Sequence, residues 1–252
     1  MYMRFLQLNV KPEGLELSKN YYFETVLPRL HTVRGCLFAY LMQNQLKKTE
    51  LISMILWEKR EDAEEYQNSP VFEQLMAEFS PFLAGSDEWK IQLSERMELE
   101  YKPVSKEPVI QSFPVFSKTK LRSSPSSEFS PMYVRILSLK LQKGKLIEFE
   151  KLYKTEIVPA LRQTNGCLCA YLMENLQEGE EVISVTIWES RKAAEDYEKN
   201  GIFNTLTDKI KHTFSNLYQW KMELAKESGK KAVTSDDISL SNYAIVTGRQ
   251  FK

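Results

Sequence analysis

The stretch GCLFAYLM at residues 35–42 recurs almost unchanged as GCLCAYLM at residues 166–173. Sliding the sequence against itself by 131 positions aligns the two stretches, and the match extends without a gap from residues 2–93 to residues 133–224. About a third of these aligned positions are identical, which is the pattern of an internal duplication. We call residues 2–93 the first repeat and residues 133–224 the second repeat.

The strands of each repeat are indicated by short apolar or alternating segments. YMRFLQLNV and its counterpart YVRILSLKL alternate with period two, as strands do. GCLFAYLM and LISMILWE are two further strands joined by a polar turn, and WKIQL and WKMEL are expected to close the two repeats as a fourth strand. Leu37, Ala39 and Leu41 are expected on the sheet face that points away from the helices.

The helices of each repeat are indicated by apolar residues at helical spacing. One helix is predicted over residues 15–34 and again over 146–165, and a second over residues 60–83 with a break at Ser69-Pro70 that its twin repeats at Asn200-Gly201. In both copies of the first helix a glycine supplies the end and a proline is expected to kink or restart it. These residues are Gly35, Gly166, Pro28 and Pro159.

The resulting order, strand-helix-strand-strand-helix-strand, predicts two ferredoxin-like βαββαβ units of the α+β class. Such a unit carries both helices on one face of its sheet, so the other face needs a cover because it is also apolar. Since a tethered second copy is present at an effective concentration on the order of millimolar, we expect it to serve as this cover. The prediction is an internal pseudo-dimer, an intramolecular dimeric α/β barrel.

The domain boundaries follow from the repeats and from what lies between them. We expect a first unit at 1–104, a linker with an extended arm at 105–131, a second unit at 132–227 and a C-terminal arm at 228–252. VIQSFPVFSKTK at 109–120 resembles SLSNYAIVTGRQ at 239–250, so each arm is predicted to add a strand to a sheet edge of the opposite unit. LRSSPSSEFSP at 121–131 has the composition of a flexible connector.

Composition excludes several classes of partner. Lys plus Arg and Asp plus Glu are both 34, so no basic excess favours nucleic acid or an anionic membrane surface. No window approaches eighteen consecutive apolar residues, and the N-terminus lacks the features of a signal peptide. Three cysteines form no disulfide framework, which favours a reducing cytoplasm.

In each repeat, the strands and the acidic helix that follows them resemble a known protein family. GCL-x-AYLM followed by ILWEKREDAEEYQNSPVFEQL, and IWESRKAAEDYEKNGIFNTL in the second repeat, resemble the antibiotic biosynthesis monooxygenase domain of the dimeric α/β barrel superfamily. The resemblance covers about 190 of the 252 residues. It implies functions that range from cofactor-independent oxygenation of polycyclic phenols, through haem breakdown, to proteins with no assigned activity.

The haem branch of this family fits the residues poorly. Its members use a helix histidine as iron ligand, together with an asparagine on the first strand and a tryptophan in the second helix. Here the helix at 60–83 contains no histidine, Tyr66 and Tyr197 stand at the tryptophan position, and the twin of Asn9 is Lys140. Neither His31 nor His212 is duplicated, so haem degradation is the least favoured of the three readings.

A cofactor-free oxygenase needs a pocket that binds an electron-rich aromatic molecule and excludes water. The duplicated polar and aromatic positions are the candidates. Arginine could stabilise a phenolate, and a tyrosine hydroxyl or an indole N–H could orient it. We therefore predict catalytic positions at Arg4, Arg135, Tyr40 and Tyr171, and a substrate pocket at Tyr22, Trp57, Tyr66, Trp89, Tyr153, Trp188, Tyr197 and Trp220.

Structural readings compete with these roles. Matched aromatic residues are also what a shared core would keep, and this is the better reading for Trp57, Trp89 and their twins. Arg4 is equally compatible with an ion pair to Glu58 or Glu98. Cys36 and Cys167 are best read as small buried hydrophobic residues, because no duplicated histidine could serve as a base.

The sequence therefore predicts a monooxygenase-like protein that binds, or oxidises without a cofactor, a small hydrophobic or aromatic molecule between each sheet and its helices. No metal is expected, because no His, Cys or carboxylate cluster has ligand spacing. The alternative is a noncatalytic barrel, whose pocket is filled by its own side chains and which serves binding or assembly. The residues leave open whether the chain catalyses anything, whether one or both pockets function, and whether pseudo-dimers associate into a homo-oligomer.

Overall fold

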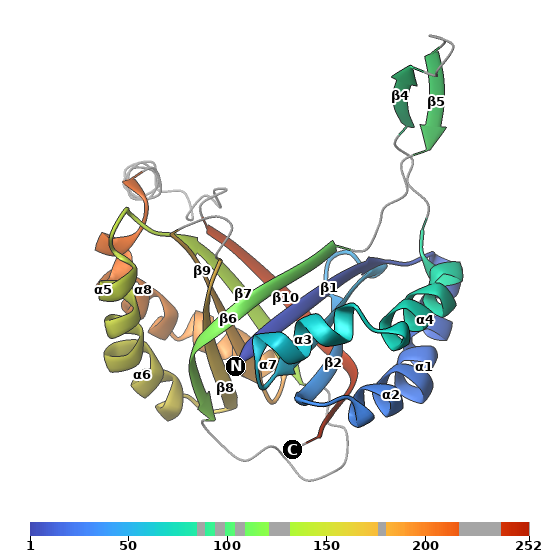
Figure 1. Cartoon of the computed structure of the whole chain (residues 1–252). Coiled ribbons are helices and arrows are strands. Elements are labelled where there is room, and N and C mark those ends of the chain that lie inside the picture. Colours follow the sequence, from blue (N-terminus) through green and yellow to red (C-terminus); the bar gives the residue numbers. More distant parts are fainter. Residues whose placement is uncertain are drawn as a thin grey trace. The chain divides into compact units, whose positions relative to one another are not determined.

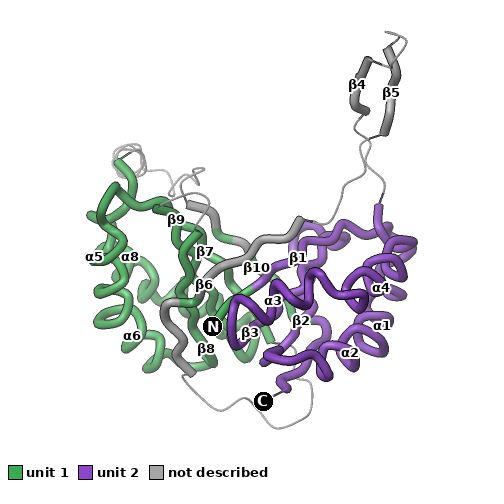
Figure 2. The backbone as a smooth tube through the Cα atoms, viewed as in Figure 1, with its two compact units in different colours: residues 1–3, 112–245 green, residues 4–111, 246–252 purple. Residues whose placement is uncertain are grey.

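The computed structural model describes residues 1–84, 89–93, 99–103, 109–120, 132–175, 180–216 and 238–251. These residues fall into two compact units (Figure 2). Unit 1 comprises residues 1–3 and 112–245, and unit 2 comprises residues 4–111 and 246–252. Unit 1 therefore contains the second repeat, and unit 2 contains nearly all of the first repeat. Each unit also includes a short segment from elsewhere in the chain, residues 1–3 in unit 1 and residues 246–252 in unit 2.

The two repeats form the same series of elements, as predicted (Figure 1). The first repeat contains β1 (Tyr2–Asn9), α1 (Leu15–Tyr21), α2 (Leu27–Thr32), β2 (Cys36–Asn44), β3 (Glu50–Trp57), α3 (Arg60–Gln67) and α4 (Pro70–Phe79). The second contains β7 (Tyr133–Lys140), α5 (Leu146–Leu152), α6 (Val158–Gln163), β8 (Cys167–Glu174), β9 (Glu181–Trp188), α7 (Arg191–Lys199) and α8 (Ile202–Ile210). Short 3-10 turns lie at Pro12–Gly14, Ser80–Phe82 and Lys211–Thr213.

The first helix of each repeat is interrupted where its proline was expected to act. A π-helical turn, Tyr22–Val26 or Tyr153–Ile157, joins the two α-helical pieces and ends two residues before the proline. Proline lacks the N–H that would continue the α-helical ladder, so the widened turn stands where the ladder loses a donor. Gly35 and Gly166 adopt φ of 74° and 80°, the left-handed conformation that ends a helix without a side-chain clash.

The break in the second helix is also confirmed in both copies. In the first repeat Ser69 caps α4, and its hydroxyl oxygen accepts a hydrogen bond from the Phe72 N–H at 3.3 Å. In the second repeat Gly201 takes φ of 75°, which allows the chain to turn between α7 and α8. The same break is thus made by a cap in one copy and by a glycine in the other.

The expectation for the fourth strand was wrong. WKIQL forms β4 (Trp89–Leu93), which pairs with β5 (Leu99–Pro103) in a separate two-stranded sheet. The segment that follows it in the sequence, β5, pairs with it, so the two strands form a local hairpin. The counterpart WKMEL lies outside the described residues.

The arms supply the fourth strands. β6 (Val109–Lys120) lies beside β1, where the N–H of Val115 donates to the carbonyl of Met1 at 3.1 Å, and it pairs with β8 of the opposite repeat. β10 (Ile238–Gln250) pairs with β7 through its first seven residues, and its last residues lie beside β2. Each arm therefore adds a strand, as expected, but this strand lies between one strand of its own repeat and one strand of the opposite repeat. The connector at 121–131 lies outside the described residues.

The order of hydrogen-bonded strands is β1-β3-β2-β10-β7-β9-β8-β6, and it closes because β6 is also the neighbour of β1. This antiparallel order is the one that the predicted barrel requires, and the fold is of the α+β class with ferredoxin-like repeats. Each repeat has the helices on one face of its strands (Figure 1). In the described part of the chain no helix is both long and apolar enough to cross a membrane.

The faces of the GCLFAYLM strand differ from the prediction. Ala39 is opposite Ile55 and Leu41 is opposite Ser53 on the side that faces the helices, and not on the side away from them. A bulge between Cys36 and Phe38 shifts the register by one residue, and a one-residue shift exchanges the two faces of a strand. Alternation alone does not reveal this bulge.

Candidate functional site

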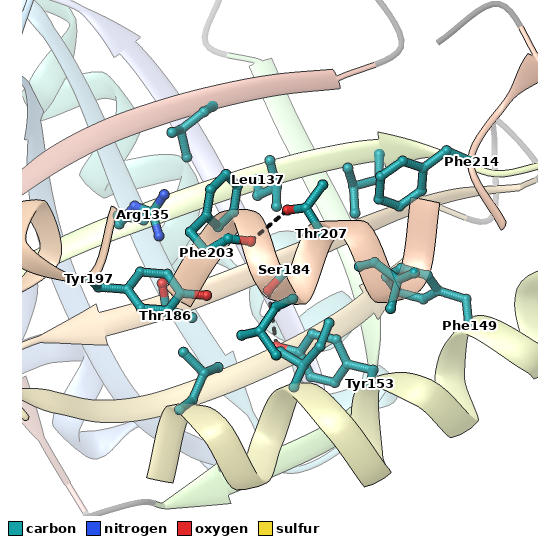
Figure 3. A pocket seen from close by; sticks show the side chains of 16 residues that line it. Arg135, Leu137, Phe149, Tyr153, Ser184, Thr186, Tyr197, Phe203, Thr207 and Phe214 are labelled. Atoms are coloured by element: carbon teal, nitrogen blue, oxygen red, sulfur yellow. Dashed lines mark hydrogen bonds between the residues drawn. The ribbon is translucent and has the colours of Figure 1, made fainter. Parts of the chain in front are cut away.

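Each repeat contains one cavity in the predicted place, between the sheet and the helices. In the second repeat it is enclosed by β7, β9, the helices α5 to α8 and Leu240 of β10. In Figure 3, Arg135 and Tyr197 lie at one end of this cavity, and Phe149 and Phe214 lie at the other. The cavity of the first repeat is lined by β1, β3, the π-helical turn, α3 and α4, with Arg4 in the place of Arg135. The arginine therefore marks the same end of both cavities.

The two cavities differ in size. The cavity of the second repeat has a volume of about 200 Å³, and that of the first repeat about 40 Å³. An apolar cavity of about 150 Å³ accepts benzene, whereas a water molecule needs only about 10–15 Å³. The second repeat can thus hold an aromatic ring, and the first has room for little more than water.

Three positions that line both cavities carry a larger side chain in the first repeat than in the second. Met76, Phe79 and Ile55 line the cavity of the first repeat. The second repeat has a smaller side chain at each of these positions, and all three line its cavity; they are Thr207, Ile210 and Thr186. The backbone frame is shared, so the larger side chains of the first repeat fill the space that the second leaves open.

Arg135 brings a positive charge to an apolar enclosure. Arg135 is only 5% exposed, and its Nη2 lies 2.6 Å from a carboxylate oxygen of Glu198. The approach to Glu198 lacks the direction of a hydrogen bond, and Nε has no hydrogen-bond partner. The guanidinium also lies over the rings of Tyr197 and Phe203, at 5.3 and 5.1 Å from their centroids. These contacts hold the cation in place while leaving donor capacity at the cavity.

Arg4 is held differently. Its Nη1 donates to the backbone carbonyl of Ala63 at 2.5 Å, and none of its nitrogens is a buried atom without a partner. Gln67 stands at the position that corresponds to Glu198, so the carboxylate of the second repeat has no counterpart there. The expected ion pair of Arg4 with Glu58 or Glu98 stays a prediction, since Glu98 lies outside the described residues.

A hydrogen-bonded tyrosine and serine pair lies in the wall of both cavities. Tyr153 Oη is 3.0 Å from Ser184 Oγ, and Tyr22 Oη is 2.8 Å from Ser53 Oγ. Each tyrosine is the first residue of the π-helical turn, which directs its ring toward the sheet. Burial raises the pKa of both phenols well above the ordinary value, and the serine contact only partly offsets this. Both tyrosines are therefore neutral at physiological pH.

A second tyrosine, Tyr197 or Tyr66, forms part of each cavity and packs on a buried tryptophan. Its ring centroid is 5.0 Å from that of Trp188 in the second repeat and 5.2 Å from that of Trp57 in the first. Burial raises the pKa of both tyrosines, and the nearby arginine lowers it in part. These phenols can donate hydrogen bonds, but they cannot serve as bases near neutral pH.

The two tryptophans show the same divergence as the cavities. The indole N–H of Trp188 donates to Thr186 Oγ1 at 2.9 Å. The indole N–H of Trp57 is buried without a hydrogen-bond partner, because Ile55 stands where the second repeat has Thr186. Thr186 thus opens the cavity and also satisfies a buried donor.

The structure brings together half of the predicted site residues. Arg4, Tyr22 and Tyr66 line one cavity, and Arg135, Tyr153 and Tyr197 line the other. Trp57 and Trp188 are fully buried behind the tyrosines and line neither cavity, which agrees with their reading as core residues.

The remaining predicted residues lie elsewhere. Tyr171 is opposite Val185, on the sheet face away from the cavity, because the bulge places Ala170 and Leu172 on the helix side instead. Tyr40 follows the same register opposite Met54. Trp89 is in the separate hairpin with β5, and Trp220 lies outside the described residues.

Several cavity residues were missed by sequence reasoning. Ser53 and Ser184 are serines at the same position of two largely apolar strands, and this duplicated polar residue was the available signal. Thr207 and Thr186 gave no comparable signal, since they are not duplicated and line the cavity only because the helix and strand register place them there.

The described residues offer no alternative chemistry based on metal or thiol. They contain no group of three or more His, Cys, Asp or Glu side chains that could hold a metal ion. Cys36, Cys167 and Cys169 are buried free thiols, and burial raises the pKa of Cys36 to about 12. A thiol of this pKa is a poor nucleophile at neutral pH, in agreement with the structural reading.

Comparison with known proteins identifies the family of this chain. The family model described as antibiotic biosynthesis monooxygenase matches residues 1–78 and 132–208, one match to each repeat. A search of curated proteins finds no match.

Several solved structures share the fold. A putative monooxygenase from Fusobacterium nucleatum superposes with a TM-score of 0.68 at 9% identity, over 99% of this chain and 94% of that one. A second one, from Lactobacillus acidophilus, has a TM-score of 0.66 at 6% identity over 99% and 96%. An anthrone oxidase-like protein has a TM-score of 0.53 at 14% identity over 99% and 92%. At these identities the likeness concerns the fold.

Proposed function

Because the chain belongs to the antibiotic biosynthesis monooxygenase family, we propose that the cavity of the second repeat binds a small aromatic molecule with an acidic hydroxyl and oxidises it with molecular oxygen, without a cofactor. The observation that carries the proposal is the buried Arg135, whose Nε has no partner, at one end of an apolar cavity of about 200 Å³.

The size of the cavity selects the substrate class. Pockets for drug-sized ligands measure about 300–1,000 Å³, and a cavity of about 150 Å³ holds a single benzene ring. A volume of about 200 Å³ suits one ring with small substituents. The apolar wall of Leu206, Phe203 and Ile210 contacts such a ring, and the polar groups at the Arg135 end receive its hydroxyl.

The chemistry follows from the charges at the cavity. Among the described residues that line it, Arg135 carries the only charge, and the tyrosines are too weakly acidic to exchange protons near pH 7. The proposed role of Arg135 is to stabilise the phenolate as the hydroxyl proton leaves to solvent, which makes the ring carbon electron-rich toward oxygen. A phenol and O₂ then yield a quinone and water: one oxygen atom becomes the new carbonyl, and the other leaves as water with the two hydrogens of the phenol.

The first repeat has a supporting role in this proposal. Its cavity is filled by its own side chains, and its arginine is engaged by a backbone carbonyl. This filled cavity also favours a second candidate function, in which neither repeat catalyses and the protein binds a small molecule only. The cytoplasmic location, the absence of a cofactor and a further association of chains stay predictions.

The test is oxygen consumption by the full-length protein with a panel of phenols and hydroquinones. The wild type is expected to consume oxygen, Arg135→Ala to lose at least about 100-fold in rate, as for removal of one oxyanion donor, and the matched control Arg4→Ala to retain the rate. Equal rates in wild type and Arg135→Ala would remove Arg135 from the mechanism. Binding of phenol without any oxygen uptake would leave the binding function and refute the oxygenase.

A further inference from the structure

A second unsatisfied polar group lies next to Arg135. Asn242 of β10 is the cross-strand partner of Arg135 in the antiparallel pair of β10 and β7. Its Oδ1 is buried and has no hydrogen-bond partner, and neither has Arg135 Nε. A donor without an acceptor and an acceptor without a donor thus occupy facing positions of two neighbouring strands.

Both groups belong to the face of the sheet that borders the cavity. Leu240, two residues before Asn242, lines the cavity together with its cross-strand partner Leu137. Because side chains alternate along a strand, Asn242 points to the same side as Leu240. Asn242 is therefore at the Arg135 end of the cavity, the end that is polar.

Leaving two buried polar atoms without partners is unfavourable, and native proteins satisfy nearly all such groups. One hydroxyl group of a ligand would satisfy both atoms, since its oxygen can accept from Arg135 Nε while its hydrogen is donated to Asn242 Oδ1. An ether oxygen could satisfy only the arginine, because it has no hydrogen to donate.

We propose that Arg135 and Asn242 form a subsite for one protonated hydroxyl of the ligand, a phenol or an enol, and that the C-terminal arm thereby determines which ligands the second repeat accepts. This inference rests on the proposed function in that it takes the same cavity as the binding site. Asn242 is a positioning residue: it orients the hydroxyl, and Arg135 stabilises the anion that forms when the proton leaves.

The experiment measures binding of phenol, anisole and benzene to the full-length protein by calorimetry, in the wild type and in Asn242→Leu. Leucine has the branched shape of asparagine, with methyl groups in place of the amide atoms, and cannot accept a hydrogen bond. The wild type is expected to bind phenol about tenfold more tightly than anisole, the effect of one hydrogen bond to a buried group. Asn242→Leu is expected to lose this preference and to keep the affinity for benzene.

The matched control is Ile245→Val, a conservative change at a buried position on the opposite face of the same strand, which should leave all three affinities unchanged. An unaltered preference for phenol in Asn242→Leu would overturn the subsite. If benzene binds but the wild type shows no preference for phenol, the cavity stands and the subsite fails. If none of the three ligands binds the wild type, the proposed function fails together with the inference.

Discussion

The two cavities have the same frame and different contents. In both repeats a π-helical turn before a proline positions a tyrosine against a serine, and a glycine ends the helix that follows. Only the side chains that fill the space differ, and they change the volume from about 40 to about 200 Å³. The residues that both repeats share therefore determine the backbone frame of the cavity. The positions at which the repeats differ decide which cavity can hold a ligand.

The largest effect is expected from opening the cavity of the first repeat. Met76→Thr with Phe79→Ile introduces the smaller residues of the second repeat. The two changes together remove about as much side-chain volume as one leucine-to-alanine substitution, so they should lower the free energy of unfolding by about 3 kcal/mol. Urea denaturation measures this loss, and benzene should restore stability if the space is formed. Unchanged stability would show that these side chains do not fill the cavity.

The converse change should close the second cavity. Thr207→Met places the residue of the first repeat among the apolar residues of the larger cavity. Filling it should raise stability by about 1 kcal/mol and should weaken phenol binding at least about 100-fold, since the ring and the methionine compete for one space. Calorimetry with phenol checks this. Tight phenol binding to Thr207→Met would place the ligand elsewhere.

Substitution of Thr186 tests how much the hydrogen bond between this cavity residue and the buried Trp188 contributes to stability. Thr186→Val conserves the shape but leaves the indole N–H of Trp188 without an acceptor, as Trp57 is in the first repeat. The expected cost is about 1–3 kcal/mol. In the Trp188→Phe background, which has no indole N–H, the same substitution should cost about 1 kcal/mol less. Equal costs in both backgrounds would argue that the hydrogen bond contributes nothing.

The buried tyrosines should make the protein sensitive to alkali. Burial raises the pKa of Tyr153, so the folded protein keeps a proton that the unfolded chain releases near pH 10. The contribution is fully present below pH 10 and is lost as pH rises above it, by about 1.4 kcal/mol per pH unit for each such tyrosine. Tyr153→Phe should reduce the slope of stability against pH between 10 and 11 by that amount. An identical slope in the variant would contradict a raised pKa.

Much of the fold could be predicted because duplication shows the same pattern twice. The strands, the interrupted helices and the exchange of arms all follow from period, proline, glycine and the similarity of residues 109–120 to 239–250. The fourth strand could not be predicted, because alternation indicates that WKIQL is a strand but not which segment it pairs with, and it pairs with β5.

The candidate site was predicted only in part. The arginines and the tyrosines of the helices were found because they are duplicated and polar or amphipathic. Tyr40 and Tyr171 were misplaced because a single bulge exchanges the faces of a strand. Thr207 was missed because it stands where the repeats differ, whereas the comparison of the copies selects what they share. Asn242 was missed because it belongs to the C-terminal arm, outside both repeats.

The most direct test of the account is a crystal structure of the full-length protein with bound phenol. We predict one phenol per chain, in the second repeat, with its ring among Tyr153, Leu206 and Phe203 and its hydroxyl toward Arg135. Phenol in the first repeat beside Arg4, or in neither cavity at a concentration that calorimetry shows to be saturating, would contradict it.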